Sequence, residues 1–113
     1  MARTFKEPTG TVLSNVLQTL LTFSTGLISG GAVLQALQFT NTGSTDRVVL
    51  VYFIPSGQVA AAQYLIGKIT VPANDTVSLH GGPFYRGSGA FVQCSQDAGT
   101  DVTAFPTAFE ETA

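Results

Sequence analysis

The chain has 113 residues, the length of one small domain, and its 44% hydrophobic and 11% charged residues exclude a disordered chain. The net charge of −2 argues against a nucleic-acid partner, because phosphate binding needs clustered Lys and Arg. One Cys and one His exclude an intramolecular disulfide and a protein-only zinc site of the usual spacing, so we expect no metal and no cofactor.

Residues 1–10 are predicted to form an extended N-terminal arm. Arg3 and Lys6 supply two of the five positive charges of the chain, and Phe5 lies between them. A frayed terminus is the common alternative for such a segment. An aromatic side chain would gain nothing in a free arm, however, so we expect this arm to lie on a neighbouring subunit.

Residues 11–17 and 19–24 are predicted to be strands, because they are rich in Val, Leu, Thr and Phe. Apolar residues also recur at three- and four-residue spacing within residues 12–21, which is the pattern of a short helix. The sequence leaves this alternative open. A turn-rich connection follows at residues 25–31.

Residues 32–41 and 46–54 are the next predicted strands, and the second of them, DRVVLVYFI, ends at Pro55. This second strand is apolar on both faces, so we expect one face to meet the opposing sheet and the other to meet a loop, a helix or another chain. Its two faces carry, respectively, Val48, Leu50, Tyr52 and Ile54, and Val49, Val51 and Phe53. We assign the second set to the contact with another chain.

The rest of the chain continues the pattern of short strands and turns, with a short helical turn or an irregular loop at residues 58–64. Strands are predicted at residues 65–71, 76–80, 84–85, 89–95 and 101–105. About eight short strands separated by turn signals are typical of a β-sandwich or barrel. We therefore predict an all-β domain over residues 11–106, built as a single antiparallel β-sandwich, followed by a short C-terminal tail at residues 107–113.

The chemically reactive residues form no convincing catalytic set. His80 could act as a general base, but it lies at a strand end and no nucleophile motif is present. Cys94 lies within a predicted strand and is expected to be a buried, inert thiol. Asp97 and Asp101 flank a hairpin loop, where turn chemistry explains them as well as a glycosidase pair or a weak Ca²⁺ site would. We expect neither an enzyme nor a small-molecule substrate.

Neither a membrane anchor nor a secretion signal is recognisable in the sequence. The longest unbroken apolar run, residues 48–54, has seven residues, whereas a membrane-spanning helix needs about 20. The basic N-terminus is followed by Glu7 and Pro8 rather than by an apolar segment. We therefore expect the protein to be made in a cytoplasm and to stay there or in an assembly formed there.

Three segments resemble a common type of small virion protein of tailed bacteriophages. They are AVLQALQFTNTGSTDRVVLVYFIPSG at residues 32–57, LIGKITVPANDTVSLHGGPF at residues 65–84 and SGAFVQCSQDAGTDVTAF at residues 88–105. The resemblance lies in the order of strands and turns and covers about residues 30–106. It implies a β-sandwich, often jelly-roll-like, that assembles in several copies on a virion and carries no catalytic residues.

The expected function is that of a non-enzymatic structural protein of a bacteriophage virion. We expect a capsid decoration or cement protein on the outer capsid surface, assembled in the bacterial cytoplasm, that binds the major capsid protein and itself as a dimer or trimer. The alternatives are a tail, fibre-base or head–tail connector component, and a carbohydrate- or receptor-binding module that uses exposed aromatic residues such as Tyr85 beside Arg86.

The arm and the tail carry opposite charge, because four of the seven acidic residues lie within residues 97–111. We therefore expect the arm and the tail to bridge neighbouring subunits. The residues predicted to form the subunit or capsid interface are Arg3, Phe5, Lys6, Val49, Val51, Phe53, Phe109, Glu110 and Glu111.

Overall fold

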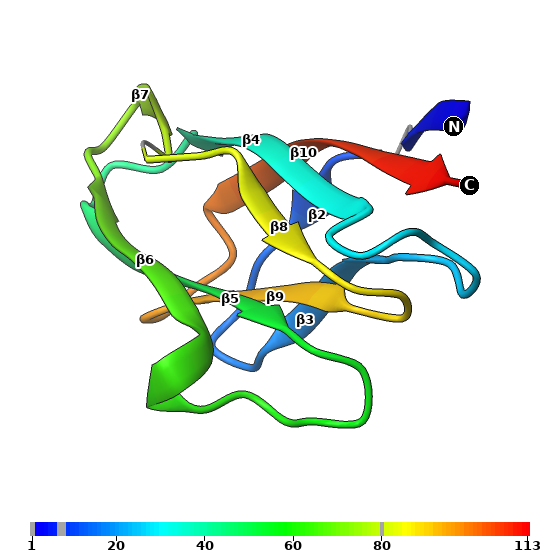
Figure 1. Ribbon diagram of the computed structural model, residues 1–113. Helices are drawn as coiled ribbons and strands as arrows, with labels where there is room; N and C mark the ends of the chain where they lie inside the picture. The colour runs from blue at the N-terminus through cyan, green and yellow to red at the C-terminus, as the bar shows by residue number, and fades with distance from the viewer. Residues whose placement is uncertain (1, 7–8, 80) are drawn as a thin grey trace.

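Two antiparallel β-sheets pack face to face in a computed structural model that describes residues 2–6, 9–79 and 81–113 (Figure 1). The described residues form ten strands and one short 3₁₀ turn, η1, at Ala62–Tyr64. The strands are β1 Ala2–Lys6, β2 Thr11–Val12, β3 Gln18–Thr22, β4 Ala32–Asn41, β5 Arg47–Ile54, β6 Leu65–Val71, β7 Asp75–Ser78, β8 Phe84–Arg86, β9 Phe91–Gln96 and β10 Val102–Thr112. The prediction of an all-β sandwich is confirmed.

The strand order is that of a jelly roll. Sheet A has the order β1-β10-β4-β7, with β2 also paired to β10 and β8 also paired to β4, and sheet B has the order β3-β9-β5-β6. Because β1 and β2 share one side of β10, and β7 and β8 share one side of β4, the ten strands occupy eight positions. The chain passes repeatedly from one sheet to the other, as in a double-sheet jelly roll.

The face of β5 that was predicted to contact another chain faces the core instead. Val49, Val51 and Phe53 are fully buried between the sheets, whereas the side chains of Val48 and Leu50 are only partly covered on the outer face of sheet B. The assignment of Val49, Val51 and Phe53 to an interface is therefore wrong. The cause is the register with β9, which places Val51 opposite Cys94 and Phe53 opposite Val92, two residues that are also fully buried.

The segment between the arm and the second predicted strand is mostly neither strand nor helix. Only Thr11 and Val12 pair with β10, and the next strand begins at Gln18. Between them the chain crosses from sheet A to sheet B, and Leu13 anchors this crossing: its amide donates to the Val102 carbonyl at 2.8 Å and its side chain is fully buried. The helical alternative for residues 12–21 is excluded.

The predicted C-terminal tail is the second half of a long strand. β10 runs without interruption from Val102 to Thr112, so the expected boundary at residues 106 and 107 falls inside it. Pro106 lies where neither β2, paired to residues 103–104, nor β1, paired to residues 108–112, continues the sheet. Its missing amide hydrogen therefore interrupts no pairing on that side.

The end of the sandwich away from the termini is closed by an ion pair between the sheets. Arg47, the first residue of β5 in sheet B, donates from Nε and one terminal nitrogen to the Asp101 carboxylate, at 3.2 and 3.1 Å. Gly43 packs against that carboxylate so closely that any side chain there would overlap it. A side chain at position 43 would therefore displace the Asp101 carboxylate.

Candidate functional site

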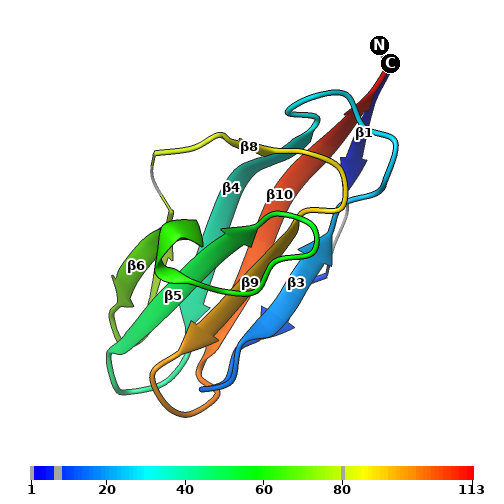
Figure 2. The ribbon, with the colours of Figure 1, turned by 60° about the horizontal axis from the view of Figure 1, so that its bottom comes forward.

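Both termini lie at the same end of the elongated sandwich, where β1 runs antiparallel to the end of β10 (Figure 2). Arg3 lies opposite Glu111 and Phe5 opposite Phe109 in this pairing. Six of the nine predicted interface residues are thereby brought together: Arg3, Phe5, Lys6, Phe109, Glu110 and Glu111. The arm and the tail pair with each other within one chain.

An apolar row crosses the outer face of sheet A at this end. Successive strand pairings place Phe5 of β1 opposite Phe109, Phe109 opposite Val33 of β4, and Val33 opposite Tyr85 of β8. We call these four residues the aromatic row. Phe5 is 60% exposed and Tyr85 is 61% exposed, while Phe109 and Val33 between them are buried. The row thus presents an aromatic ring to solvent at each end of a covered middle.

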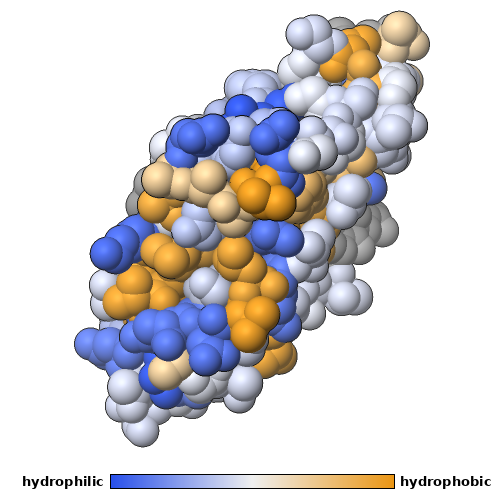
Figure 3. All heavy atoms as spheres, turned by 90° about the horizontal axis from the view of Figure 1, so that it is seen from below, coloured by the Kyte–Doolittle hydropathy of each residue, from blue (hydrophilic) through white to orange (hydrophobic). Residues whose placement is uncertain are grey.

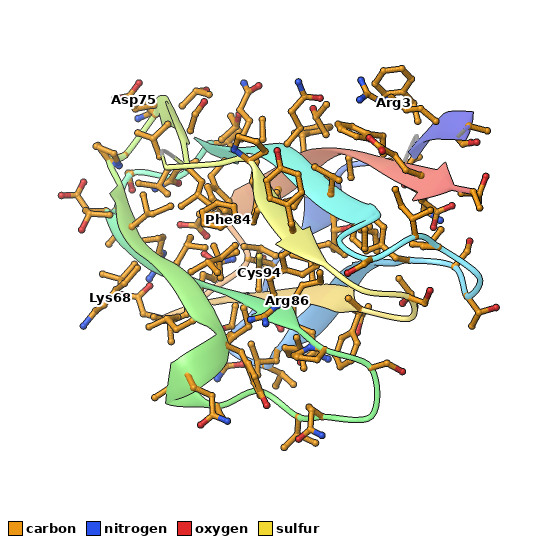
Figure 4. The ribbon with its side chains drawn as sticks, in the orientation of Figure 1. Arg3, Lys68, Asp75, Phe84, Arg86 and Cys94 are labelled. Atoms are coloured by element: carbon orange, nitrogen blue, oxygen red, sulfur yellow. The ribbon has the colours of Figure 1, made fainter. Side chains whose placement is uncertain are left out.

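Arg3 fastens β1 to the aromatic row. Its guanidinium lies 4.3 Å from the centre of the Phe109 ring and forms a 3.0 Å ion pair with Glu111 (Figure 4). The ring of Phe5 meets the same Phe109 ring edge-on, with 5.8 Å between the ring centres. Aromatic and cation–π contacts of this kind each contribute about 0.5–1.5 kcal/mol. They explain why Phe109 is covered although it does not face the core.

Glu110 points the other way and ties three segments together. Its carboxylate accepts hydrogen bonds from the Ser24 amide and, at 3.1 Å, from the Ser24 hydroxyl, and it lies 3.6 Å from the Lys6 ammonium. Burial alone would raise the pKa of Glu110, but the hydrogen bonds from Ser24 and the charge of Lys6 outweigh it and lower this pKa. The negative charge of Glu110 therefore holds both the loop at Ser24 and the arm at Lys6.

The described surface also carries two hollows. One, of about 490 Å³, separates β1 from β3 and is lined by Thr4, Phe5, Lys6, Leu20, Leu21, Thr22 and Glu110. The other, of about 300 Å³, lies on the outer face of sheet B and is lined by Asn15, Val48, Leu50, Lys68, Ser95, Gln96 and Asp97. The view onto sheet B shows apolar side chains gathered on this face and bordered by hydrophilic ones (Figure 3). Val48 and Leu50 therefore contribute to a second apolar surface.

Tyr85 and Arg86 do not form the combined sugar-binding pair that the sequence suggested. Tyr85 lies on the outer face of sheet A, opposite Val33. Arg86 reaches from β8 toward sheet B (Figure 4). The Arg86 guanidinium lies 5.5 Å from the Tyr64 ring centre and 5.9 Å from that of Phe53. Arg86 therefore covers one side of the core, and Tyr85 alone remains available to a ligand.

The residues weighed for catalysis have structural surroundings or lie outside the described residues. Cys94 is fully buried, as expected, and burial raises the pKa of its thiol. Asp97 accepts hydrogen bonds from the Val48 and Ala98 amides at 3.3 and 3.0 Å, and Asp101 pairs with Arg47. His80 lies outside the described residues. Within the part of the chain that the structure describes, no three potential metal ligands gather, and no helix has the length and hydropathy to cross a membrane.

Sequence reasoning did not find Val33 or Phe105, and it assigned Tyr85 to a sugar-binding pair with Arg86 rather than to this row. Val33 and Tyr85 join the row only through the register of β4 with β10 and with β8, which no local pattern encodes. Phe105 is 47% exposed on the same strand as Phe109. Gly10 packs beneath the Phe105 ring, where an added Cβ would overlap it. Gly10 was the one sequence feature that could have indicated this close contact between the arm and the sheet.

Comparison with protein-family models, with curated proteins and with solved structures found no match to this chain.

Proposed function

We propose that this chain is a non-enzymatic structural protein of a bacteriophage virion that decorates the outer capsid surface by binding the major capsid protein. The jelly-roll sandwich is the architecture that the resemblance of residues 32–57, 65–84 and 88–105 to phage virion proteins implies. Jelly rolls serve many functions, however, so the fold supports the proposal without carrying it.

The observation that carries the proposal is the aromatic row. Aromatic residues and Arg are enriched at protein–protein interfaces and dominate their energetics. Phe5 and Tyr85 are each about three-fifths exposed, and Phe105 adds a third partly exposed ring on the same sheet. Exposed rings on one rigid sheet are expected where another protein covers them.

The low charge of the chain supports the same proposal. Only 11% of the residues are charged, against about 25% in typical soluble domains. The three ion pairs among the described residues use Arg3, Lys6 and Arg47, together with their acidic partners. A surface with so few remaining charges suits permanent burial in an assembly, because obligate interfaces are more apolar than ordinary surface.

The test is sedimentation of the purified protein with capsid shells assembled without it. We expect the wild-type chain to sediment with the shells, and the double variant F5A/Y85A to bind at least about tenfold more weakly, because truncated aromatic anchors cost most at interfaces. The matched control V16A/V59A removes two side chains that are 66% and 77% exposed but lie outside the aromatic row. We expect this control to bind like the wild type.

Two results would contradict the proposal at different points. If the wild-type chain does not sediment with shells, capsid decoration fails, and tail, fibre-base or connector particles become the next material to test. If F5A/Y85A binds as well as the control, the protein still decorates the shell, but the aromatic row is not the surface it uses.

One observation favours a second candidate, a carbohydrate-binding module. The Tyr85 ring is 61% exposed on a flat sheet face, which is a suitable platform for stacking against a sugar. A glycan array distinguishes the two functions, because a sugar-binding module would give signals that Y85A abolishes and F5A leaves unchanged. The decoration proposal expects no glycan signal from any of these proteins.

A further inference from the structure

Among the described strands, β1 pairs with β10 alone. It pairs only with residues 108–112, and four of its five residues are exposed. A hollow of about 490 Å³ separates it from β3, the nearest edge of the other sheet. None of the buried residues that form the core belongs to β1. Moving β1 away from its own β10 therefore leaves the core closed.

The described strand pairing, ion pairs and aromatic contacts of β1 are all made with residues 108–112 of β10. Arg3 pairs with Glu111 at 3.0 Å and Lys6 lies 3.6 Å from Glu110, so two positive charges meet two negative charges in a fixed register. Each copy of the chain offers the same acidic strand end. The β1 strand of a second copy would find there the same register, the same ion pairs and the same aromatic contact.

We propose that two copies of this chain exchange their β1 strands, so that the β1 strand of each copy pairs with β10 of the other. Exchange of an identical element is a low-cost route to a dimer, because the exchanged contacts are those already present in the single chain. The inference goes beyond the proposed function, since it concerns the isolated protein and requires no virion.

The linker limits how the two copies can lie. Residues 7–10 connect β1 to β2, and the five Cα–Cα steps from Lys6 to Thr11 span at most about 18 Å when fully extended. β2 keeps its pairing with residues 103–104, and Gly10 packs beneath the Phe105 ring, so the inner end of the linker stays on its own copy. The two β10 strands must therefore lie side by side, related by a two-fold axis.

Exchange also gives two exposed rings a partner. In the single chain Phe5 and Phe105 are 60% and 47% exposed on the outer face of sheet A at the β10 edge, whereas Tyr85 lies two strands away on β8. Two β10 strands placed side by side bring a second pair of Phe5 and Phe105 rings close to the first. The apolar area buried there is the gain that a closed single chain lacks.

The first experiment uses two charge-reversed variants, R3E and E111R. Each variant alone places like charges side by side at this position, whether its arm is closed or exchanged. When the two are mixed and exchange reciprocally, one arm restores Arg3 against Glu111 and the other places Glu against Arg at the same positions. Native mass spectrometry should show heterodimers about three- to tenfold in excess of the two homodimers combined, because both ion pairs are then attractive.

The second experiment traps the exchanged strand directly. Ala2 lies opposite Thr112 in the β1–β10 pairing, and directly opposite residues in antiparallel strands are close enough for a disulfide. A2C protein mixed with T112C protein should give a covalent heterodimer on mild oxidation. T107C is the matched control, because Thr107 is exposed on the same strand but pairs with β4 and not with β1. We expect A2C with T107C to give no more heterodimer than background.

These experiments can overturn the inference without touching the proposed function. If all variants stay monomeric at high concentration, and the double variant A2C/T112C forms only an intramolecular disulfide, β1 stays on its own chain and exchange is refuted. Such a monomer could still sediment with capsid shells. Conversely, heterodimers from a protein that never binds shells would support exchange and contradict the decoration proposal.

Discussion

The two ends of strand β10 carry ion pairs of similar length that hold very different parts of the molecule. At the first end, Asp101 pairs with Arg47 at 3.1 Å and joins sheet A to sheet B, with both side chains less than one quarter exposed. At the other end, Glu111 pairs with Arg3 at 3.0 Å, but the Arg3 side chain is 56% exposed and belongs to the terminal strand β1. The first pair closes the fold, whereas the second holds a strand that the core does not need.

The difference shows that an ion pair must be judged by the elements it joins. Exposed pairs contribute at most about 1 kcal/mol each, so the Arg3–Glu111 pair adds little to the stability of the sandwich. It is well suited to setting the register of a strand and the choice of its partner. On the proposals above, the terminal end serves recognition, whereas the closed end stabilises the fold.

The largest expected effect comes from the core between the two ends. F53A should lower the free energy of unfolding by about 3–5 kcal/mol, because it empties a fully buried position facing the opposite sheet. F5A, at the 60% exposed end of the aromatic row, should cost about 1 kcal/mol or less. Urea unfolding followed by circular dichroism measures both. Similar losses for the two variants would contradict the separation of core and terminal end.

Deletion of residues 2–6 should have a smaller effect on stability. The core contains none of these residues, so we expect the free energy of unfolding to fall by less than about 2 kcal/mol. The same deletion should abolish strand exchange. Differential scanning calorimetry and sedimentation velocity on one sample provide both readings, and a protein that fails to fold without β1 would show that the arm belongs to the core.

Glu110 should make the terminal end sensitive to acid. Its pKa is lower in the folded chain than in the unfolded chain, so its stabilising contribution is complete above the ordinary value of about 4.3 and is lost as the pH falls through the folded value. E110Q should lower the free energy of unfolding by about 1 kcal/mol at neutral pH. It should also reduce the loss of stability that the wild type shows as the pH becomes acidic. Thermal unfolding of both proteins between pH 7 and strongly acidic pH tests this. An unchanged loss in E110Q would contradict the assignment.

The smallest effects should separate the two ion pairs themselves. D101N should cost about 1 kcal/mol, because it leaves the partly buried Arg47 without its partner. E111Q should change stability by about 0.3 kcal/mol or less, because the Arg3 side chain is largely exposed. Chemical unfolding at low and high salt measures the difference. Equal costs would remove the distinction between the closed end and the terminal end.

The sequence predicted the fold class because alternation and turn signals are local. The predicted strand at 65–71 coincides with β6, and that at 32–41 coincides with β4. Local patterns could not say which face of β5 is inside, because both faces are apolar and the choice depends on the pairing with β9. They also could not show that β10 continues past Pro106, since that continuation depends on β1 and β4 lying beside it.

The candidate site was predictable only where charge and aromatic residues are visible in the termini. Arg3, Phe5 and Glu111 were found because opposite charges and an aromatic residue stood out in segments expected to be free. Val33 was not found, and Tyr85 was assigned to a sugar-binding pair instead, because the two meet only through a pairing between segments about 50 residues apart. Surface rows across a sheet are a property of register, and register is not local.

Imaging of the native virion at a resolution that traces this chain tests the central claim most directly. The account predicts density for the chain on the outer capsid, with Phe5 and Tyr85 covered by a neighbouring chain. A chain on the shell whose aromatic row faces solvent, with another surface at the contact, would contradict the role given to the terminal end.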